Sequence, residues 1–168
     1  MRTYDCILNR RSTRKFKCED VSILDVYRML EAAMAAPSAK NSQPWEFYII
    51  KTKEVQDQIK AISPAYNYNS RMLVVVAFNL ENTLSKSLND FAIQDCSAAI
   101  ENMLLTAEEL ELGTVWCGAY PNVERSNAIR TILKEKDNIV PLAVIQIGYK
   151  DEIKEPRTQF DSNKVHTI

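Results

Sequence analysis

The sequence has little of the chemistry on which many enzyme active sites are built. Its single histidine, His166, lies close to the C-terminal end, so histidine-rich metal sites are excluded and a Ser-His-Asp triad would depend on a near-terminal base. At least 11 residues separate consecutive cysteines, which is poor spacing for zinc, an iron–sulfur cluster or a dithiol couple. We therefore interpret Cys6, Cys18, Cys96 and Cys117 as buried free thiols.

Glycine is equally scarce, because the chain contains only Gly113, Gly118 and Gly148. Their spacing cannot supply the G-x-G-x-x-G pattern of dinucleotide-binding domains. Gly113 and Gly118 have the spacing of a phosphate loop, but Ala119-Tyr120 stands where that loop requires lysine followed by serine or threonine. A Rossmann domain and a nucleotide triphosphatase are therefore both disfavoured.

The remaining composition is that of an ordinary globular protein. Of 168 residues, 46% are hydrophobic and 26% are charged, and 21 basic residues stand against 22 acidic ones. We expect a single domain over residues 1–168 and no general polyanion binder. No apolar run approaches the ~20 residues of a membrane helix, and the N-terminal segment does not resemble a signal peptide. We expect a cytoplasmic protein with reduced thiols and neither membrane nor nucleic-acid partners.

Apolar periodicity and turn residues predict alternating helices and strands. The predicted helices begin at Thr3 and at the capping residue Ser22, and further helices cover 54–61, 88–112 and 123–135, the last with Asn122 as its cap. The predicted strands cover 45–51, 72–78, 114–120 and 139–148. Gly113 is interpreted as the C-cap of the long helix, and the glutamates near the end of that helix as solvated charge. By itself the alternation favours an α/β fold.

An arginine-rich segment, Arg10-Arg11-Ser12-x-Arg14, is the first candidate for binding chemistry. Guanidinium groups match phosphate oxygens in pairs and stay charged at any working pH, so the segment suits a phosphate monoester. A solvated basic face or a weak nucleic-acid contact is the alternative.

Three motifs together carry a resemblance to a known family. Arg10-Arg-Ser-x-Arg14, Ala36-Pro-Ser-Ala-Lys-Asn-Ser-Gln-Pro-Trp45 and Leu110-Glu-Leu-Gly-Thr-Val-Trp-Cys-Gly118 resemble, in order and spacing, the nitroreductase family of FMN-dependent oxidoreductases. The resemblance spans essentially the whole chain. It implies an α+β fold in place of α/β, with a mostly antiparallel central sheet flanked by helices. It also implies a homodimer in which a C-terminal arm, residues 149–168, is exchanged between subunits.

The resemblance implies a cofactor site assembled from segments far apart in the chain. Arg10, Arg11, Ser12 and Arg14 match the flavin-binding segment, in which Arg10 and Ser12 would hold the phosphate and ribityl chain and Arg14 the N1–C2 carbonyl edge. Pro37, Ser38, Ala39 and Asn41 match the segment that packs on the flavin of the other subunit. Asn69, with Asn67 and Arg71 as neighbours, would contact the pyrimidine edge. Gly118 and Ala119 would approach flavin N5, and Arg157 with Lys154 would close on the phosphate.

The function implied is that of an NAD(P)H oxidoreductase, with FMN carrying the chemistry and no catalytic side chain. Hydride transfer through flavin N5 would reduce a nitroaromatic, a quinone or a similar electron-poor acceptor in ping-pong order. Two alternatives stay open: another flavin chemistry on the same scaffold, such as reductive dehalogenation or consumption of the flavin, and a non-enzymatic anion-binding module. Asp95 is interpreted as a core or interface residue without a catalytic role.

Overall fold

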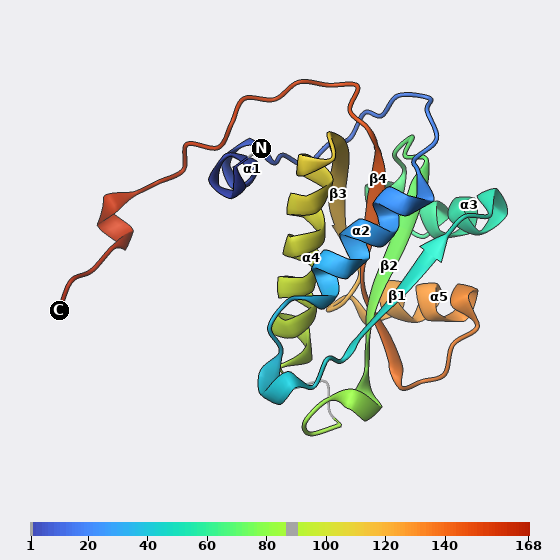
Figure 1. The fold of residues 1–168 in the computed structure, drawn as a ribbon. Coiled ribbons are helices and arrows are strands. Elements are labelled where there is room, and N and C mark those ends of the chain that lie inside the picture. Colours follow the sequence, from blue (N-terminus) through green and yellow to red (C-terminus); the bar gives the residue numbers. More distant parts are fainter. Residues whose placement is uncertain (1, 87–90) are drawn as a thin grey trace.

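A four-stranded sheet forms the centre of the computed structural model, which describes residues 2–86 and 91–168 (Figure 1). In spatial order the strands are β1 (Trp45–Ile50), β2 (Met72–Asn79), β4 (Ile139–Tyr149) and β3 (Leu112–Gly118). All three neighbouring pairs are antiparallel. The α+β expectation is thus confirmed, and the α/β fold favoured by alternation alone is wrong.

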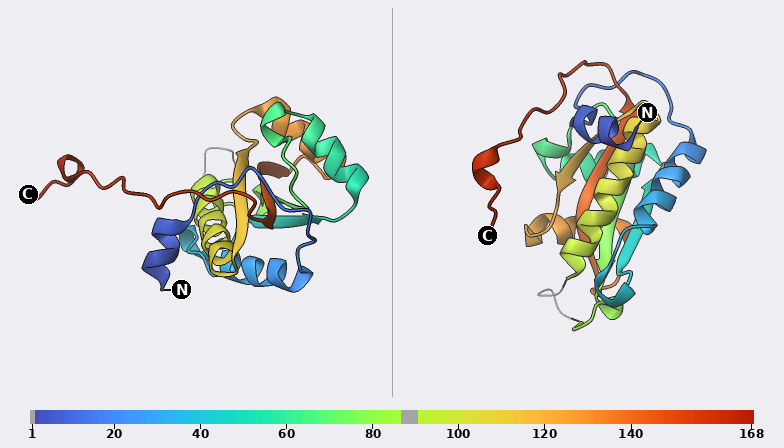
Figure 2. Two further views of the ribbon diagram at one scale, coloured as in Figure 1. Left: turned by 90° about the horizontal axis from the view of Figure 1, so that it is seen from above. Right: turned by 60° about the vertical axis from the view of Figure 1, so that its left-hand side comes forward.

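Helices cover both faces of this sheet (Figure 2). The helices are α1 (Thr3–Asn9), α2 (Ile23–Met34), α3 (Lys53–Ala61), α4 (Ala92–Glu109) and α5 (Val123–Leu133). The apolar sides of α2 and α4 pack on one face in the larger core cluster, while α3 and α5 contribute to a second cluster on the other face. The central strands β2 and β4 are buried almost throughout, which explains their continuous apolar sequences.

Side-chain caps start two of the helices where the sequence predicts them. The Ser22 hydroxyl accepts a hydrogen bond from the backbone of Leu24, and the Asn122 side chain accepts one from the backbone of Arg125. The long helix is described from Ala92, and residues 88–90 of its predicted span lie outside the described residues. Its C-terminal end, Glu109, lies a few residues before the predicted end at 112.

Two sequence interpretations of this long helix are wrong. Gly113 does not cap α4, since the helix ends at Glu109, a left-handed φ of 60° falls on Glu111, and Gly113 lies inside β3. Glu108 is not solvated, because it is buried and its carboxylate pairs with the Lys150 ammonium at 2.6 Å. The cysteine interpretation also needs one correction: Cys18 is exposed, whereas the other three are buried.

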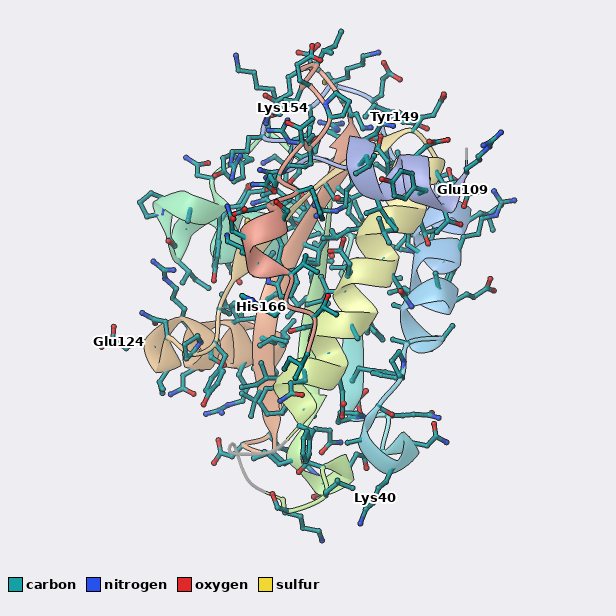
Figure 3. All side chains as sticks on the ribbon, turned by 90° about the vertical axis from the view of Figure 1, so that its left-hand side faces the viewer. Lys40, Glu109, Glu124, Tyr149, Lys154 and His166 are labelled. Carbon is teal, nitrogen blue, oxygen red and sulfur yellow. The ribbon has the colours of Figure 1, made fainter. Side chains whose placement is uncertain are left out.

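The C-terminal residues leave the body of the molecule as an extended arm with one short helical turn, Ser162–Lys164 (Figures 1 and 2). Its apolar side chains Ile153, Phe160 and Ile168 are exposed, and His166 lies on this arm (Figure 3). Within residues 2–86 and 91–168, the helices are all too short or too polar to cross a membrane.

Candidate functional site

Residues 10–16, here called the cationic segment, run in an extended conformation between α1 and the sheet. Ser12 forms a parallel bridge with Thr114 of β3, and the Thr13 N–H donates to the Thr114 carbonyl at 2.8 Å. Phe16 forms an antiparallel bridge with Lys150, just beyond β4. The cationic segment is therefore attached to the sheet at its β3 edge.

Two glycines explain how closely the cationic segment approaches the sheet. Gly113 and Gly148 face each other across the β3–β4 pair. A Cβ atom on Gly113 would lie 2.7 Å from Thr13 Cγ2, and one on Gly148 would lie 2.8 Å from Phe16 Cδ1. Both distances are shorter than van der Waals contact, and both Thr13 and Phe16 are buried. The glycine pair thus provides the space into which these two side chains pack.

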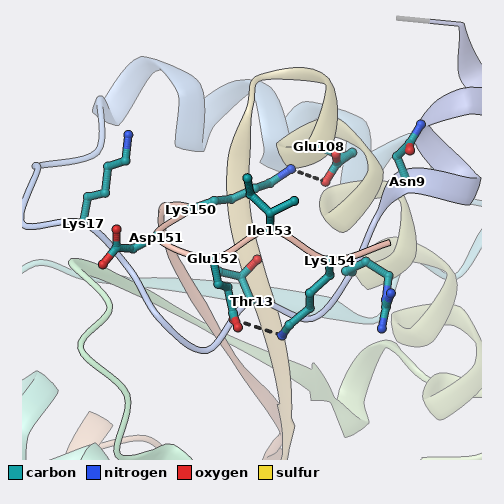
Figure 4. A pocket seen from close by; sticks show the side chains of 10 residues that line it. Asn9, Thr13, Lys17, Glu108, Lys150, Asp151, Glu152, Ile153 and Lys154 are labelled. Atoms are coloured by element: carbon teal, nitrogen blue, oxygen red, sulfur yellow. Dashed lines mark hydrogen bonds and ion pairs between the residues drawn. The ribbon is translucent and has the colours of Figure 1, made fainter. Parts of the chain in front are cut away.

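The opposite edge of the cationic segment meets side chains from the start of the C-terminal arm (Figure 4). The Glu152 carboxylate accepts hydrogen bonds from the backbone N–H groups of Arg14 and Lys15, the latter at 3.2 Å. Lys154 donates to the Ser12 carbonyl and pairs with Glu152 at 2.9 Å. We call Glu152 and Lys154 the tail pair. Together with Arg11 and the Glu108–Lys150 ion pair, the tail pair lines a cavity of about 910 Å³.

The Asn69 side chain binds the backbone at the end of the cationic segment. Its side-chain oxygen accepts from the Phe16 N–H at 3.0 Å, and its side-chain nitrogen donates to the Phe16 carbonyl at 2.6 Å. Asn69, which is predicted to contact the flavin, thus lies beside the cationic segment, but its side-chain amide is hydrogen-bonded to the Phe16 backbone. One N–H and one lone pair of this amide remain for a ligand.

The side chains of the cationic segment fit an anionic ligand such as the phosphate of FMN. The Arg11 Nε is buried without a hydrogen-bond partner among the described residues, although its Nη1 reaches the Glu155 carbonyl. Within residues 2–86 and 91–168, the Arg14 guanidinium and the Ser12 hydroxyl make no hydrogen bond. Arg10 pairs with Glu101 at 3.0 Å in a partly exposed contact, which a phosphate can replace at little cost. Unpartnered guanidinium and hydroxyl donors along one segment suit phosphate oxygens.

The end of β3 lies near Arg14 and is held by a buried polar network. The Tyr66 hydroxyl donates to the Gly118 carbonyl at 2.8 Å, and Gln146 donates to the Tyr66 carbonyl at 2.8 Å. Gln146 is fully buried and also accepts from Ser70 at 2.7 Å. Burial raises the pKa of Tyr66 to about 12, so its hydroxyl stays a donor at any working pH.

Charge from the cationic segment reaches the same strand end. Burial raises the pKa of the Cys117 thiol, while the nearby Arg14 charge acts in the opposite direction. Gly118 is exposed, with open space where a Cβ would stand, and the neighbouring Ala119 is buried. Arg157 contacts α1, which leads into the cationic segment, because its backbone N–H donates to the Leu8 carbonyl at 2.8 Å. The structure therefore brings most of the predicted site residues to one edge of the sheet.

The proline-flanked loop, residues 37–44, lies away from the cationic segment. It leads into β1, the outer strand opposite β3, and Figure 3 places Lys40 and Lys154 at opposite ends of the molecule. Pro37, Ser38, Ala39 and Asn41 are thus not brought to the other predicted site residues within one chain.

The conformation of the proline-flanked loop depends on strained backbone and on Asp95 of α4. Lys40, Asn41 and Gln43 have φ values of 50°, 57° and 47°, and non-glycine residues in this region cost about 1–3 kcal/mol each. The buried Asp95 carboxylate accepts from the Ala39 N–H at 3.0 Å and from the Ser42 hydroxyl at 3.4 Å. The interpretation of Asp95 as a residue of the core or an interface missed this contact.

Sequence reasoning also missed Tyr66, Gln146 and Glu152. A single glutamine within the apolar strand β4 was a usable signal for a buried polar network, since buried polar groups need partners. Glu152 gave no such signal, because an acidic residue in a polar tail is ordinary.

Comparisons with known proteins give a consistent result. The sequence model described as Nitroreductase family matches residues 7–83 and 68–149. A protein of Archaeoglobus fulgidus, provisionally named NADH dehydrogenase/NAD(P)H nitroreductase, is 39% identical over 168 residues, covering 95% of this chain and 94% of the relative.

Two solved structures are similar along almost their whole length. One, from Parabacteroides distasonis ATCC 8503 and provisionally named NADH dehydrogenase/NAD(P)H nitroreductase, has a TM-score of 0.91 and 35% identity, covering 98% of this chain and 96% of the other. The second, an FMN-dependent nitroreductase from Clostridium difficile R20291, has a TM-score of 0.86 and 30% identity, covering 98% of both chains.

Proposed function

The chain belongs to the nitroreductase family, and we propose that this NAD(P)H-dependent flavin oxidoreductase reduces nitroaromatic, quinone or similar electron-poor acceptors in ping-pong order. Bound FMN would supply the hydride transfer, taking a hydride from NADH or NADPH at N5 and passing it to the acceptor. The protein's own residues then have to bind, orient and shield the cofactor. Two relatives support this assignment by name, one as an FMN-dependent nitroreductase and one as an NAD(P)H nitroreductase.

The observation that carries the proposal is the cationic segment beside the open end of β3, in which the Arg11 Nε and the Arg14 guanidinium have no hydrogen-bond partner among the described residues and Arg10 has only a partly exposed ion pair. Arg10, Arg11 and Ser12 would hold the phosphate and ribityl chain, with Arg157 close by on the arm. The family resemblance implies that Arg14 would stand at the pyrimidine edge, and its charge is close enough to the end of β3 to act on Cys117. A fixed cation there stabilises the negative charge that reduction places on the flavin ring. Asn69, Gly118 and Ala119 would complete the contacts from the same chain.

We propose that the second half of each site comes from another copy of the chain. The proline-flanked loop cannot meet the cationic segment of its own chain, because the two lie at opposite edges of the sheet. In a homodimer, Pro37, Ser38, Ala39 and Asn41 of one subunit would cover the flavin of the other. The chain would act as one domain over residues 1–168, and the arm, residues 149–168, would extend across its partner, which would bury Phe160 and Ile168.

The visible absorption spectrum of the purified protein tests the proposal most directly. After a high-salt wash we expect a flavin spectrum that bleaches on anaerobic addition of NADH or NADPH and returns when a nitroaromatic or quinone is added. Arg14→Ala should weaken FMN binding, whereas Arg28→Ala, which removes an exposed arginine on α2, should not. A protein that neither retains nor takes up FMN would contradict the proposal and favour an anion-binding module.

A further inference from the structure

The backbone of the cationic segment has two edges with different partners. In an extended chain, successive residues direct their N–H and C=O groups to opposite sides. Thr13 accordingly donates toward β3, whereas the Ser12 carbonyl and the Arg14 N–H point away from it. Without further contacts, the backbone groups on that outward edge would be open to solvent.

The tail pair occupies this outward edge in a complementary way. Lys154 supplies the donor for the Ser12 carbonyl, and Glu152 supplies the acceptor for the Arg14 N–H. The alternation ends at Arg14, because the next N–H, that of Lys15, turns to the same carboxylate. The two side chains are 25% and 19% exposed and pair with each other. Burial acts to raise the pKa of Glu152, but its hydrogen bonds to Arg14, Lys154 and Lys15 outweigh that effect and the pKa is lowered. Glu152 is thus a charged acceptor, and charge-assisted hydrogen bonds are the stronger kind.

A carboxylate beside a segment that binds an anion requires a specific reason. As a neighbouring charge alone, Glu152 would repel a phosphate and weaken the field of Arg14. Its oxygen instead accepts a hydrogen bond from the backbone N–H of Arg14, one bond away from the Cα atom that carries the side chain. The backbone position of Arg14 therefore depends on an acidic residue of the arm, far away in the sequence.

We propose that Glu152 is a positioning residue, which holds the Arg14 backbone so that the guanidinium stands at the pyrimidine edge of bound FMN. The inference rests on the proposed function. It makes the reduction potential of the bound flavin depend on the arm, although the Glu152 carboxylate need not touch the cofactor.

The sign of the change in potential separates positioning from a direct charge effect. Glu152→Gln removes a negative charge near the flavin, which by electrostatics alone would raise the midpoint potential. Loss of the Arg14 position would lower it, because the cation then stabilises the reduced flavin less. The glutamine side-chain oxygen is uncharged and therefore a weaker acceptor for the Arg14 and Lys15 N–H groups. For Glu152→Gln we expect a lower potential at saturating FMN and about tenfold weaker FMN binding.

Glu155→Gln is the matched control. It removes the same charge from the same arm, and among the described residues Glu155 accepts a hydrogen bond through its backbone carbonyl and makes none through its side chain. Glu152→Asp is the second variant, because it keeps the charge but shortens the reach. Positioning predicts that the aspartate variant resembles the glutamine variant, whereas a charge effect predicts that it resembles the wild type.

The measurements are FMN titration by fluorescence quenching and anaerobic potentiometry. Each variant is first required to have the circular dichroism spectrum of the wild type. A raised potential in Glu152→Gln, or wild-type values in both Glu152 variants, would overturn the inference. Failure of the wild-type protein to bind FMN would instead overturn the proposed function, so the two failures are distinguishable.

Discussion

The cationic segment and the proline-flanked loop would bind the same cofactor, yet they are held in different ways. The cationic segment is bonded to β3, packed over the glycine pair, and contacted by Asn69 and the tail pair. The loop contains three residues with left-handed backbone and depends on Asp95 for its contact with α4. The cationic segment is thus hydrogen-bonded to the edge strand β3, whereas the proline-flanked loop is a strained loop that leads into β1 at the opposite edge.

In the proposed shared site, this difference would follow from what each segment has to do. A segment that binds phosphate and sets the charge at the flavin must be rigid before the cofactor arrives, because ordering it on binding would cost affinity. A loop that reaches a second subunit has to project from its own chain, where few contacts are available. Strained backbone maintained by one buried carboxylate is consistent with such a role.

The largest expected effect is on the glycine pair. Gly113→Ala places a methyl group against the buried Thr13 side chain, so the cationic segment has to move away from β3. Overpacking of this kind costs about 1–3 kcal/mol, and we expect FMN affinity to fall by about tenfold to a hundredfold. Thr13→Ala in the same protein removes two of the three closest atoms, Cγ2 and Oγ1, and should restore part of the affinity.

Gly118→Ala is the stability control for that experiment, since no atom of the described residues other than its chain neighbours lies within 4 Å of the added methyl. Its apo-protein should melt at the wild-type temperature. If Gly113→Ala also melts and binds FMN as the wild type does, the sheet does not determine where the cationic segment lies.

A smaller effect is expected at the loop. Asp95→Ala removes the acceptor for the Ala39 N–H and the Ser42 hydroxyl, at a cost of about 1–3 kcal/mol. We expect weaker FMN binding with the cationic segment unchanged. Mixing this variant with Arg14→Ala tests the division between subunits. In a homodimer with shared sites, each mixed dimer has one intact and one doubly defective site.

Random mixing should therefore recover about a quarter of the wild-type sites. Each variant alone, refolded and titrated in the same way, provides the baseline. No recovery on mixing, with mixed dimers present by mass spectrometry, would show that both halves of a site belong to one chain.

The predictability of the two regions differs for physical reasons. The Ser22 and Asn122 caps were predictable, because a cap depends on residues within one helical turn. The role of Gly113 was not, since it depends on Thr13, which approaches only after the sheet has formed. The arrangement of the strands is likewise non-local, and alternation alone predicted the wrong class. The family resemblance corrected the fold, but it did not indicate the contacts of Asp95 or Glu152.

The smallest expected effect is a pH dependence confined to the cationic segment. The ordinary pKa of glutamate, 4.5, is lowered in Glu152, so its hydrogen bonds contribute fully above that value and are lost as the pH falls through the lowered pKa. Because Glu152→Gln lacks the charge at every pH, its difference from the wild type in FMN affinity should be constant between about pH 5 and 8 and should shrink as the pH falls below 4.5 and through the lowered pKa. FMN titrations of both proteins across this range measure the difference. A difference that instead changes between pH 6 and 8 would have to come from another group, and Glu152 would not be the residue that links the arm to the cationic segment.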